Sequence, residues 1–164
     1  MQKMAQLLCV GALAASVALP AAAQVEKSQE AALTARGEYL VKLGGCNDCH
    51  TDGFAASDAK TPMKDWLTGS ALGFNGPWGT TYATNLRLLV HGMSEAQWLE
   101  ELRTMNPKPP MPWWALKWMT QDDQRAVYAF IHSLGPAGQA TPNDLPPGAT
   151  PTTPVVAWPG APPK

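Results

Sequence analysis

Five consecutive residues, Cys46-Asn47-Asp48-Cys49-His50, constrain this chain more than any other part of its sequence. The spacing C-x-x-C-H is typical of covalent haem attachment, in which each cysteine forms a thioether with one vinyl group of the ring. The histidine that follows directly is tethered beneath the iron and becomes its proximal ligand. Cys46 and Cys49 are therefore predicted to hold one haem c covalently, and His50 is predicted to bind its iron.

The two cysteines could instead belong to a zinc site or to a thiol redox centre. A zinc site would need a second pair of ligands, but the chain has no second C-x-x-C, and His91 and His132 are far apart in sequence. A thioredoxin-like centre would need a βαβ context. The flanking sequence favours helices instead, so a thiol–disulfide oxidoreductase stays only as an alternative from a different class.

Residues 1–23 have the pattern of a secretory signal peptide. Lys3 supplies a positive start, an apolar run covers residues 7–19, and Ala21-Ala22-Ala23 offers small residues for cleavage. The run is too short and too rich in alanine for a typical transmembrane helix, so no transmembrane span is expected in the mature chain. An uncleaved N-terminal anchor is the alternative.

The remaining chain divides by composition. Residues 24–134 are long enough for one domain, whereas residues 135–164 carry nine of the sixteen prolines and are predicted to be an extended or disordered tail. A solvated spacer is the simpler interpretation of this tail, and a segment lying on a partner is the other. The net charge of −1, without a basic patch interleaved with aromatics, argues against a nucleic-acid partner.

Apolar periodicity predicts a mainly α domain. One helix is expected over about residues 27–43 and ends at Gly44-Gly45. A second is expected to begin after Ser94 and a third after Thr120, each with a capping-box pattern. Residues 51–92 show little periodicity, and a loop of that length is usually functional or disordered. A large apolar prosthetic group at the centre of the core would explain it.

Several segments occur in a characteristic order along the chain. They are Arg36-Gly37-Glu38-Tyr39-Leu40, the C-x-x-C-H with Thr51, Gly76-Pro77-Trp78-Gly79-Thr80-Thr81-Tyr82-Ala83-Thr84-Asn85-Leu86 and Pro109-Pro110-Met111-Pro112-Trp113. In this order they resemble the small monohaem class I cytochromes c, in particular the cytochrome c domains associated with periplasmic alcohol and sugar dehydrogenases of Gram-negative bacteria. The resemblance covers about residues 31–134. It implies a cytochrome c fold of three to four helices with long loops wrapped around one covalent haem, and a crossing of the first and last helices at Gly37 and Tyr128.

The second axial ligand of the iron is the main open choice. Met111 is flanked by Pro110 and Pro112, which keep the backbone extended and rigid, and the resemblance also implies this methionine. His91 is the leading alternative with two histidine ligands. The other candidates are Met63, Met93, Met105, Met119 and His132.

A histidine–methionine pair raises the reduction potential relative to two histidines, because a thioether donates weakly and favours ferrous iron. The resemblance thus implies a periplasmic electron carrier, not an enzyme, that cycles between Fe(II) and Fe(III). Its expected partners are a periplasmic dehydrogenase or quinol-oxidising complex as donor and an oxidase as acceptor. A subunit of a dehydrogenase complex and a haem-based ligand sensor are the alternatives.

The middle loop is expected to surround the ring and to provide hydrogen-bond donors for the two haem carboxylates, which need partners when partly buried. The predicted residues are Trp78, Tyr82 and Asn85, with Thr84 and Arg87 as further donors.

Overall fold

The structure is a computed structural model that describes residues 18–159. Contacts divide the chain into two units, 1–32 and 33–164. Helix α1 (Ala18–Leu43) begins nine residues before the predicted start, because the added stretch is rich in alanine, the best helix former. Most of the predicted signal peptide lies outside the described residues. Within the described part, no helix is long and apolar enough to cross a membrane.

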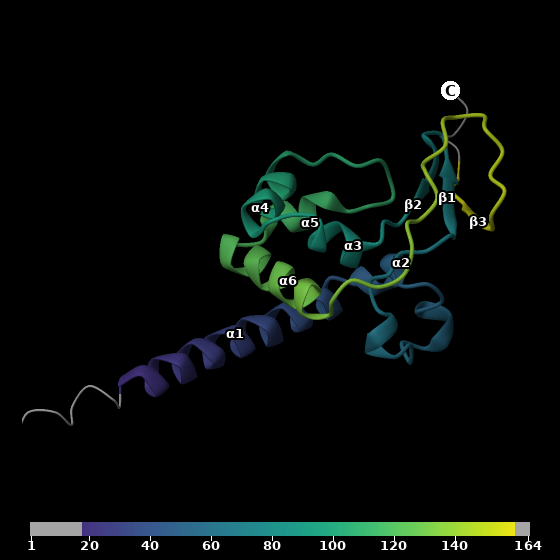
Figure 1. The fold of residues 1–164 in the computed structure, drawn as a ribbon. Coiled ribbons are helices and arrows are strands. Elements are labelled where there is room, and N and C mark those ends of the chain that lie inside the picture. The colour runs from purple at the N-terminus through teal and green to yellow at the C-terminus, as the bar shows by residue number, and fades with distance from the viewer. Residues whose placement is uncertain (1–17, 160–164) are drawn as a thin grey trace, which may run out of the picture. The chain divides into compact units, whose positions relative to one another are not determined.

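The second unit is built mainly from helices and carries one small sheet (Figure 1). The mainly α class is confirmed, but the described residues hold six α-helices where three to four were expected. After α1 the helices are α2 (Cys46–His50), α3 (Leu86–His91), α4 (Glu95–Thr104), α5 (Trp113–Trp118) and α6 (Gln121–Ser133). The 3₁₀ turns are Ala55–Ser57 and Met63–Asp65, and the strands are β1 (Gly73–Gly76), β2 (Gly79–Tyr82) and β3 (Val155–Ala157).

The two predicted helix starts are present, and one of them differs in detail. Ser94 and Gln97 form the complete capping box of α4. Thr120 accepts a hydrogen bond from the backbone N–H of Asp123 at the start of α6. The carboxylate of Asp123 does not complete that box, because it accepts a 2.9 Å hydrogen bond from Arg36 of α1 instead. This bond lowers the pKa of Asp123 and links the two helices.

Helices α1 and α6 cross at Gly37. A Cβ atom there would overlap the backbone carbonyl of Ala126 and lie 2.7 Å from the Cβ of Phe130. The predicted crossing glycine is therefore correct, but the aromatic residue it meets is Phe130. Tyr128 lies on a different face of α6, where its hydroxyl donates to the carbonyl of Met93.

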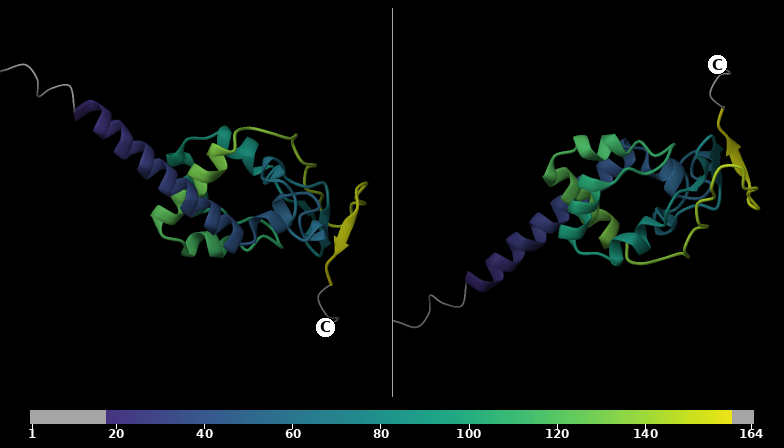
Figure 2. Two further views of the ribbon diagram at one scale, coloured as in Figure 1. Left: turned by 90° about the horizontal axis from the view of Figure 1, so that it is seen from below. Right: turned by 90° about the horizontal axis from the view of Figure 1, so that it is seen from above.

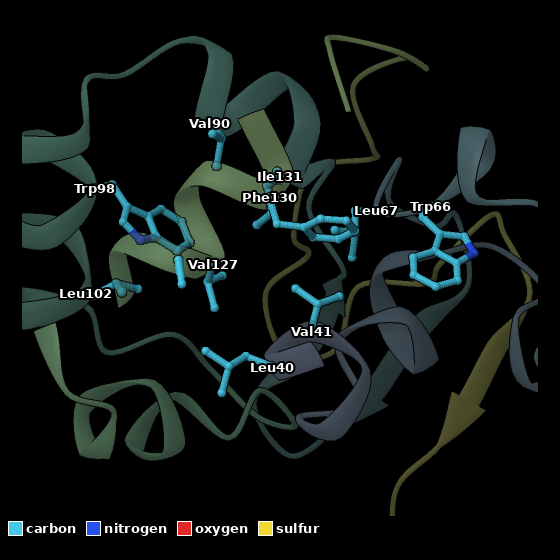
Figure 3. Packing of buried hydrophobic residues seen from close by; sticks show 11 residues of the cluster. Leu40, Val41, Trp66, Leu67, Val90, Trp98, Leu102, Val127, Phe130 and Ile131 are labelled. Carbon is cyan, nitrogen blue, oxygen red and sulfur yellow. The ribbon is translucent and has the colours of Figure 1, made fainter. Parts of the chain in front are cut away.

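The core of the second unit is formed by side chains from four helices and one loop (Figure 3). Leu40 and Val41 of α1 lie near Phe130 and Val127 of α6, and Leu67 from the loop before β1 lies beside Phe130. All five side chains are buried. The other buried members are Trp66, Val90, Trp98, Leu102, Ala126 and Ile131.

The proline-rich segment folds back onto the domain instead of extending as a spacer. After α6 the chain runs to the sheet, where β3 lies parallel to β1 at its edge (Figures 1 and 2). We call residues 136–158 the strap. Composition could not reveal this because prolines lower regular periodicity without preventing extended pairing at an edge. The strap pairs through Leu145 with Thr80 of β2 and through the N–H of Trp158 with Asn75 of β1.

The helix crossing provides a direct test of the fold. We expect Gly37→Ala to lower the free energy of unfolding by about 1–3 kcal/mol, because the added methyl overlaps the backbone of α6. Gly92→Ala is the matched control, since a Cβ there lies 3.4 Å from its nearest neighbours, which is ordinary contact. Chemical denaturation followed by circular dichroism measures both. Equal stability of the two variants would contradict the close crossing.

Candidate functional site

The C-x-x-C-H residues form a short helix of their own. Gly45 precedes α2 with φ 63, a left-handed conformation that glycine adopts without strain, so the chain turns directly from the end of α1 into α2. In a helix, residues i, i+3 and i+4 share one face. Cys46, Cys49 and His50 have this spacing within α2, so both sulfurs and the imidazole lie on the same face.

A hydrogen bond fixes the proton of His50. Its Nδ1 lies 2.7 Å from the backbone carbonyl of Thr84. A carbonyl only accepts, so Nδ1 carries the proton and Nε2 carries the lone pair. Burial lowers the pKa of His50, which favours this neutral form. No hydrogen bond from the described residues reaches Nε2, so it is free to bind a metal ion.

Cys46 and Cys49 form no disulfide and are half-buried in this structure. Burial raises the pKa of Cys46 to about 11 and also raises the pKa of Cys49. Thiol–disulfide exchange needs an accessible thiolate, and redox-active C-x-x-C motifs lower the pKa of their cysteines. The environment of Cys46 and Cys49 has the opposite effect, so it argues against a thiol–disulfide oxidoreductase.

A buried polar network attaches α2 to the loop before β1. The hydroxyl of Thr51 donates to Asn47 Oδ1 at 2.6 Å and accepts from the backbone N–H of Leu67 at 2.7 Å. The N–H of Gly69 donates to the carbonyl of His50 at 2.8 Å. Neither Asn47 nor Thr51 was predicted, and the only sequence signal was their position inside and directly after the motif.

The segment that holds His50 also holds the loop of Met111. Thr81 lies three residues before Thr84, and its hydroxyl donates to the carbonyl of Pro109 at 2.7 Å. Extended chain spans at most about 10 Å over three residues, so both attachments lie on one short stretch. Met111 itself is half-buried and is not among the side chains packed against the core cluster.

The other candidate iron ligands have different surroundings. Met93, Met105 and Met119 pack against the core, where methionine commonly fills space, and Met63 is 39% exposed. His91 donates from Nε2 to the carbonyl of His132, and the two rings stack with centroids 4.3 Å apart. In this arrangement His91 pairs with the end of α6.

The predicted haem-surrounding residues fall into two groups. Tyr82 and Asn85 both form hydrogen bonds to the strap: the Tyr82 hydroxyl lies 3.0 Å from that of Thr153, and Asn85 donates to the carbonyls of Ala137 and Gln139. Trp78 packs edge-on against Trp158, but its buried Nε1 has no hydrogen-bond partner among residues 18–159. Trp78 alone of the three keeps a free donor.

Two further donors named from the sequence have other roles in the structure. Arg87 donates to the backbone carbonyls of Lys64, Leu134 and Gly135, so it closes the end of α6. Thr84 contributes its carbonyl to His50, which is an acceptor role.

The described side chains fit a covalent haem better than a bare metal ion. Residues 18–159 contain no group of three or more His, Cys, Asp or Glu side chains that could hold a metal. Two half-buried thiols and one imidazole with a free Nε2, all on one helix face, are the donor set that a haem c requires.

Comparisons with known proteins give distant relatives. The chain is 27% identical over 159 residues to the gluconate 2-dehydrogenase cytochrome c subunit of Pantoea cypripedii, covering 85% of this chain and 32% of that protein. It is 31% identical over 121 residues to the alcohol dehydrogenase (quinone), cytochrome c subunit of Gluconacetobacter polyoxogenes and to that of Komagataeibacter europaeus, covering 67% of this chain and 24% of each. No family model and no solved structure matches.

These relatives support the resemblance at a coarse level. All three are named as cytochrome c subunits of dehydrogenases, which supports haem binding and electron transfer. The chain spans about a third or less of the length of each relative. The activity and the partners of the complete relatives therefore cannot be assigned to this chain from the similarity alone.

The network around Thr51 yields a second prediction. We expect Thr51→Val to lower the free energy of unfolding by about 2–3 kcal/mol, because it leaves the N–H of Leu67 and the side-chain amide oxygen of Asn47 buried without the hydroxyl as partner. Thr51→Ser keeps the hydroxyl and should restore most of the stability. Chemical denaturation of both variants is the measurement, and a valine variant as stable as the serine variant would contradict the network.

Proposed function

We propose that this protein is a periplasmic electron carrier with one covalent haem c and no catalytic activity of its own. Cys46 and Cys49 tether the group, and His50 and Met111 are the axial ligands. The observation that carries the proposal is the single face of α2, on which two thiols accompany an imidazole whose Nδ1 is hydrogen-bonded and whose Nε2 is free.

The roles of the residues follow from their contacts. Cys46 and Cys49 fix the position of the ring by two bonds. His50 presents Nε2 in one orientation, because Thr84 holds the opposite nitrogen. A hydrogen bond from the ring nitrogen that does not bind the metal orients the ligand and raises its basicity. A bound haem supplies one-electron chemistry.

Met111 is the proposed second ligand. Its loop is attached through Pro109 to Thr81, close to the Thr84 carbonyl that holds His50. Met111 is also outside the core packing that occupies Met93, Met105 and Met119. A thioether opposite an imidazole gives a higher potential than two imidazoles, as suits a carrier that accepts electrons.

The proposed surroundings of the ring include Trp78, Tyr82 and Asn85. Trp78 is the best supported donor for a haem carboxylate, because its buried Nε1 bonds to nothing in the described part of the chain. Tyr82 and Asn85 already bond to the strap, so we propose that they shape the wall of the site through the backbone.

The proposed donor is a periplasmic dehydrogenase or a quinol-oxidising complex, and the proposed acceptor is an oxidase. The names of the relatives support the dehydrogenase. We also propose that residues 1–23 are a signal peptide that directs export to the periplasm, since covalent haem attachment and a periplasmic partner both require export. Permanent membership of a dehydrogenase complex is the variant of this proposal that the relatives' names favour.

The choice of Met111 predicts a specific outcome. Met111→Ala should keep the covalent haem but lower the reduction potential and allow carbon monoxide to bind the reduced iron, because the sixth position opens. Spectroelectrochemical titration and a carbon monoxide difference spectrum measure both effects.

Met63→Ala is the matched control, because Met63 is exposed on a 3₁₀ turn. It should keep the parent potential and bind carbon monoxide as poorly as the parent protein. An unchanged spectrum and potential in Met111→Ala would contradict the assignment. Tight carbon monoxide binding by the unmodified protein would favour a ligand sensor.

A further inference from the structure

We infer that the strap sets the position of the Thr84 carbonyl through Asn85, and thereby tunes the proximal ligand His50. Asn85 is a positioning residue in this account, and the inference rests on the proposed haem function. The acceptor for His50 is a backbone oxygen. Substitution of the Thr84 side chain would leave that oxygen in place, so the neighbouring contacts must control it.

Asn85 is connected on both sides. Its Oδ1 accepts from the N–H of Leu88 and caps α3, while its Nδ2 donates to the strap carbonyls of Ala137 at 2.8 Å and Gln139 at 3.1 Å. Only 3% of Asn85 is exposed. Because Asn85 directly follows Thr84, these bonds hold the peptide that presents the carbonyl to His50.

The strap also packs closely on the same stretch. A Cβ at Gly138 of the strap would lie 2.9 Å from Asn85 Nδ2 and 3.0 Å from the Cβ of Thr68. A Cβ at Gly69 would overlap the Thr141 side chain and lie 2.8 Å from the backbone nitrogen of Asn85. Such close approach leaves little freedom for residues 83–85 while the strap is in place.

A third attachment lies two residues before Thr84. The N–H of Tyr82 donates to Asp144 of the strap at 3.2 Å, and the hydroxyl of Tyr82 bonds to that of Thr153. The strap therefore holds both ends of the segment 82–85. Loss of these bonds should lengthen the bond from His50 Nδ1, lower the basicity of the imidazole and favour ferrous iron.

Asn85→Ser separates the strap contact from the helix cap. Serine is a good N-cap residue and is neutral, but it is too short to reach the two strap carbonyls. We expect a higher reduction potential. Because two hydrogen bonds are lost, we also expect the His50 Nδ1 proton to exchange with solvent faster, by on the order of tenfold. Spectroelectrochemical titration and proton NMR of the haem-loaded protein measure the two effects.

Asn75→Ser is the matched control. It removes a 2.7 Å amide bond to Thr80 in the sheet without touching residues 82–85, so it should reduce stability but leave the potential and the proton exchange unchanged. The inference is overturned if Asn85→Ser leaves both unchanged, or if Asn75→Ser shifts them equally.

Truncation supplies a second variant should Asn85→Ser accumulate poorly. A chain ending at Pro136 loses the strap and should reproduce the higher potential. A chain ending at Thr153 loses β3 but keeps the strap bonds to Asn85 and to Tyr82, so it should match the parent. Equal potentials in the two truncations would overturn the inference. Absence of covalent haem from the unmodified protein would instead contradict the proposed function, so the two failures are distinguishable.

Discussion

The hydrogen bond from His50 Nδ1 to the carbonyl of Thr84 is the interaction on which the rest of the site depends. Without it the imidazole could rotate or adopt the other tautomer, and α2 would carry two thiols beside an imidazole of undefined orientation and protonation. With it, Nε2 is the only ring nitrogen available to a metal ion. The surrounding structure serves to keep these two partners together: Gly69 holds the carbonyl of His50, and the N–H groups of Leu86 and Arg87, directly after Asn85, donate to the carbonyl of Leu67.

Leu67 shows how tightly this connection is made. It is fully buried, has φ 60 and exchanges hydrogen bonds with both sides of the site, through Thr51 and through Leu86. A non-glycine residue in this conformation costs about 1–2 kcal/mol. Its three hydrogen bonds, from its N–H to Thr51 and to its carbonyl from Leu86 and Arg87, offset that cost together with the core contacts of its side chain. The left-handed conformation of Leu67 therefore allows its backbone to connect α2 with the segment that follows β2.

The sequence predicted the parts of the molecule that rest on local rules. The end of α1 before Gly44 and the cap at Ser94 each depend on a few neighbouring residues. The crossing at Gly37, which brings α1 onto Ala126 and Phe130 of α6, was expected from the family resemblance and not from a local rule. The strap was not predictable in this way, since its bonds join residues about 50 or more apart, as between Asn85 and Ala137. The sheet was missed because β1 and β2 have only four residues each and are largely glycine and threonine, and β3 has only three residues within the proline-rich segment. Phe130 lies at the crossing where Tyr128 was expected. Which of the two faces Gly37 depends on the rotation of α6 about its axis, which periodicity defines only within a residue or two.

The intact mass of the protein isolated from the periplasm tests whether the face of α2 carries a covalent haem. We expect the mass of the chain from residue 24 plus one haem, with no thiol left to react with an alkylating reagent. A Cys46→Ala, Cys49→Ala double variant should carry no covalent haem. Unmodified cysteines, or a disulfide between them, in protein from cells that load other c-type haem proteins would contradict the account.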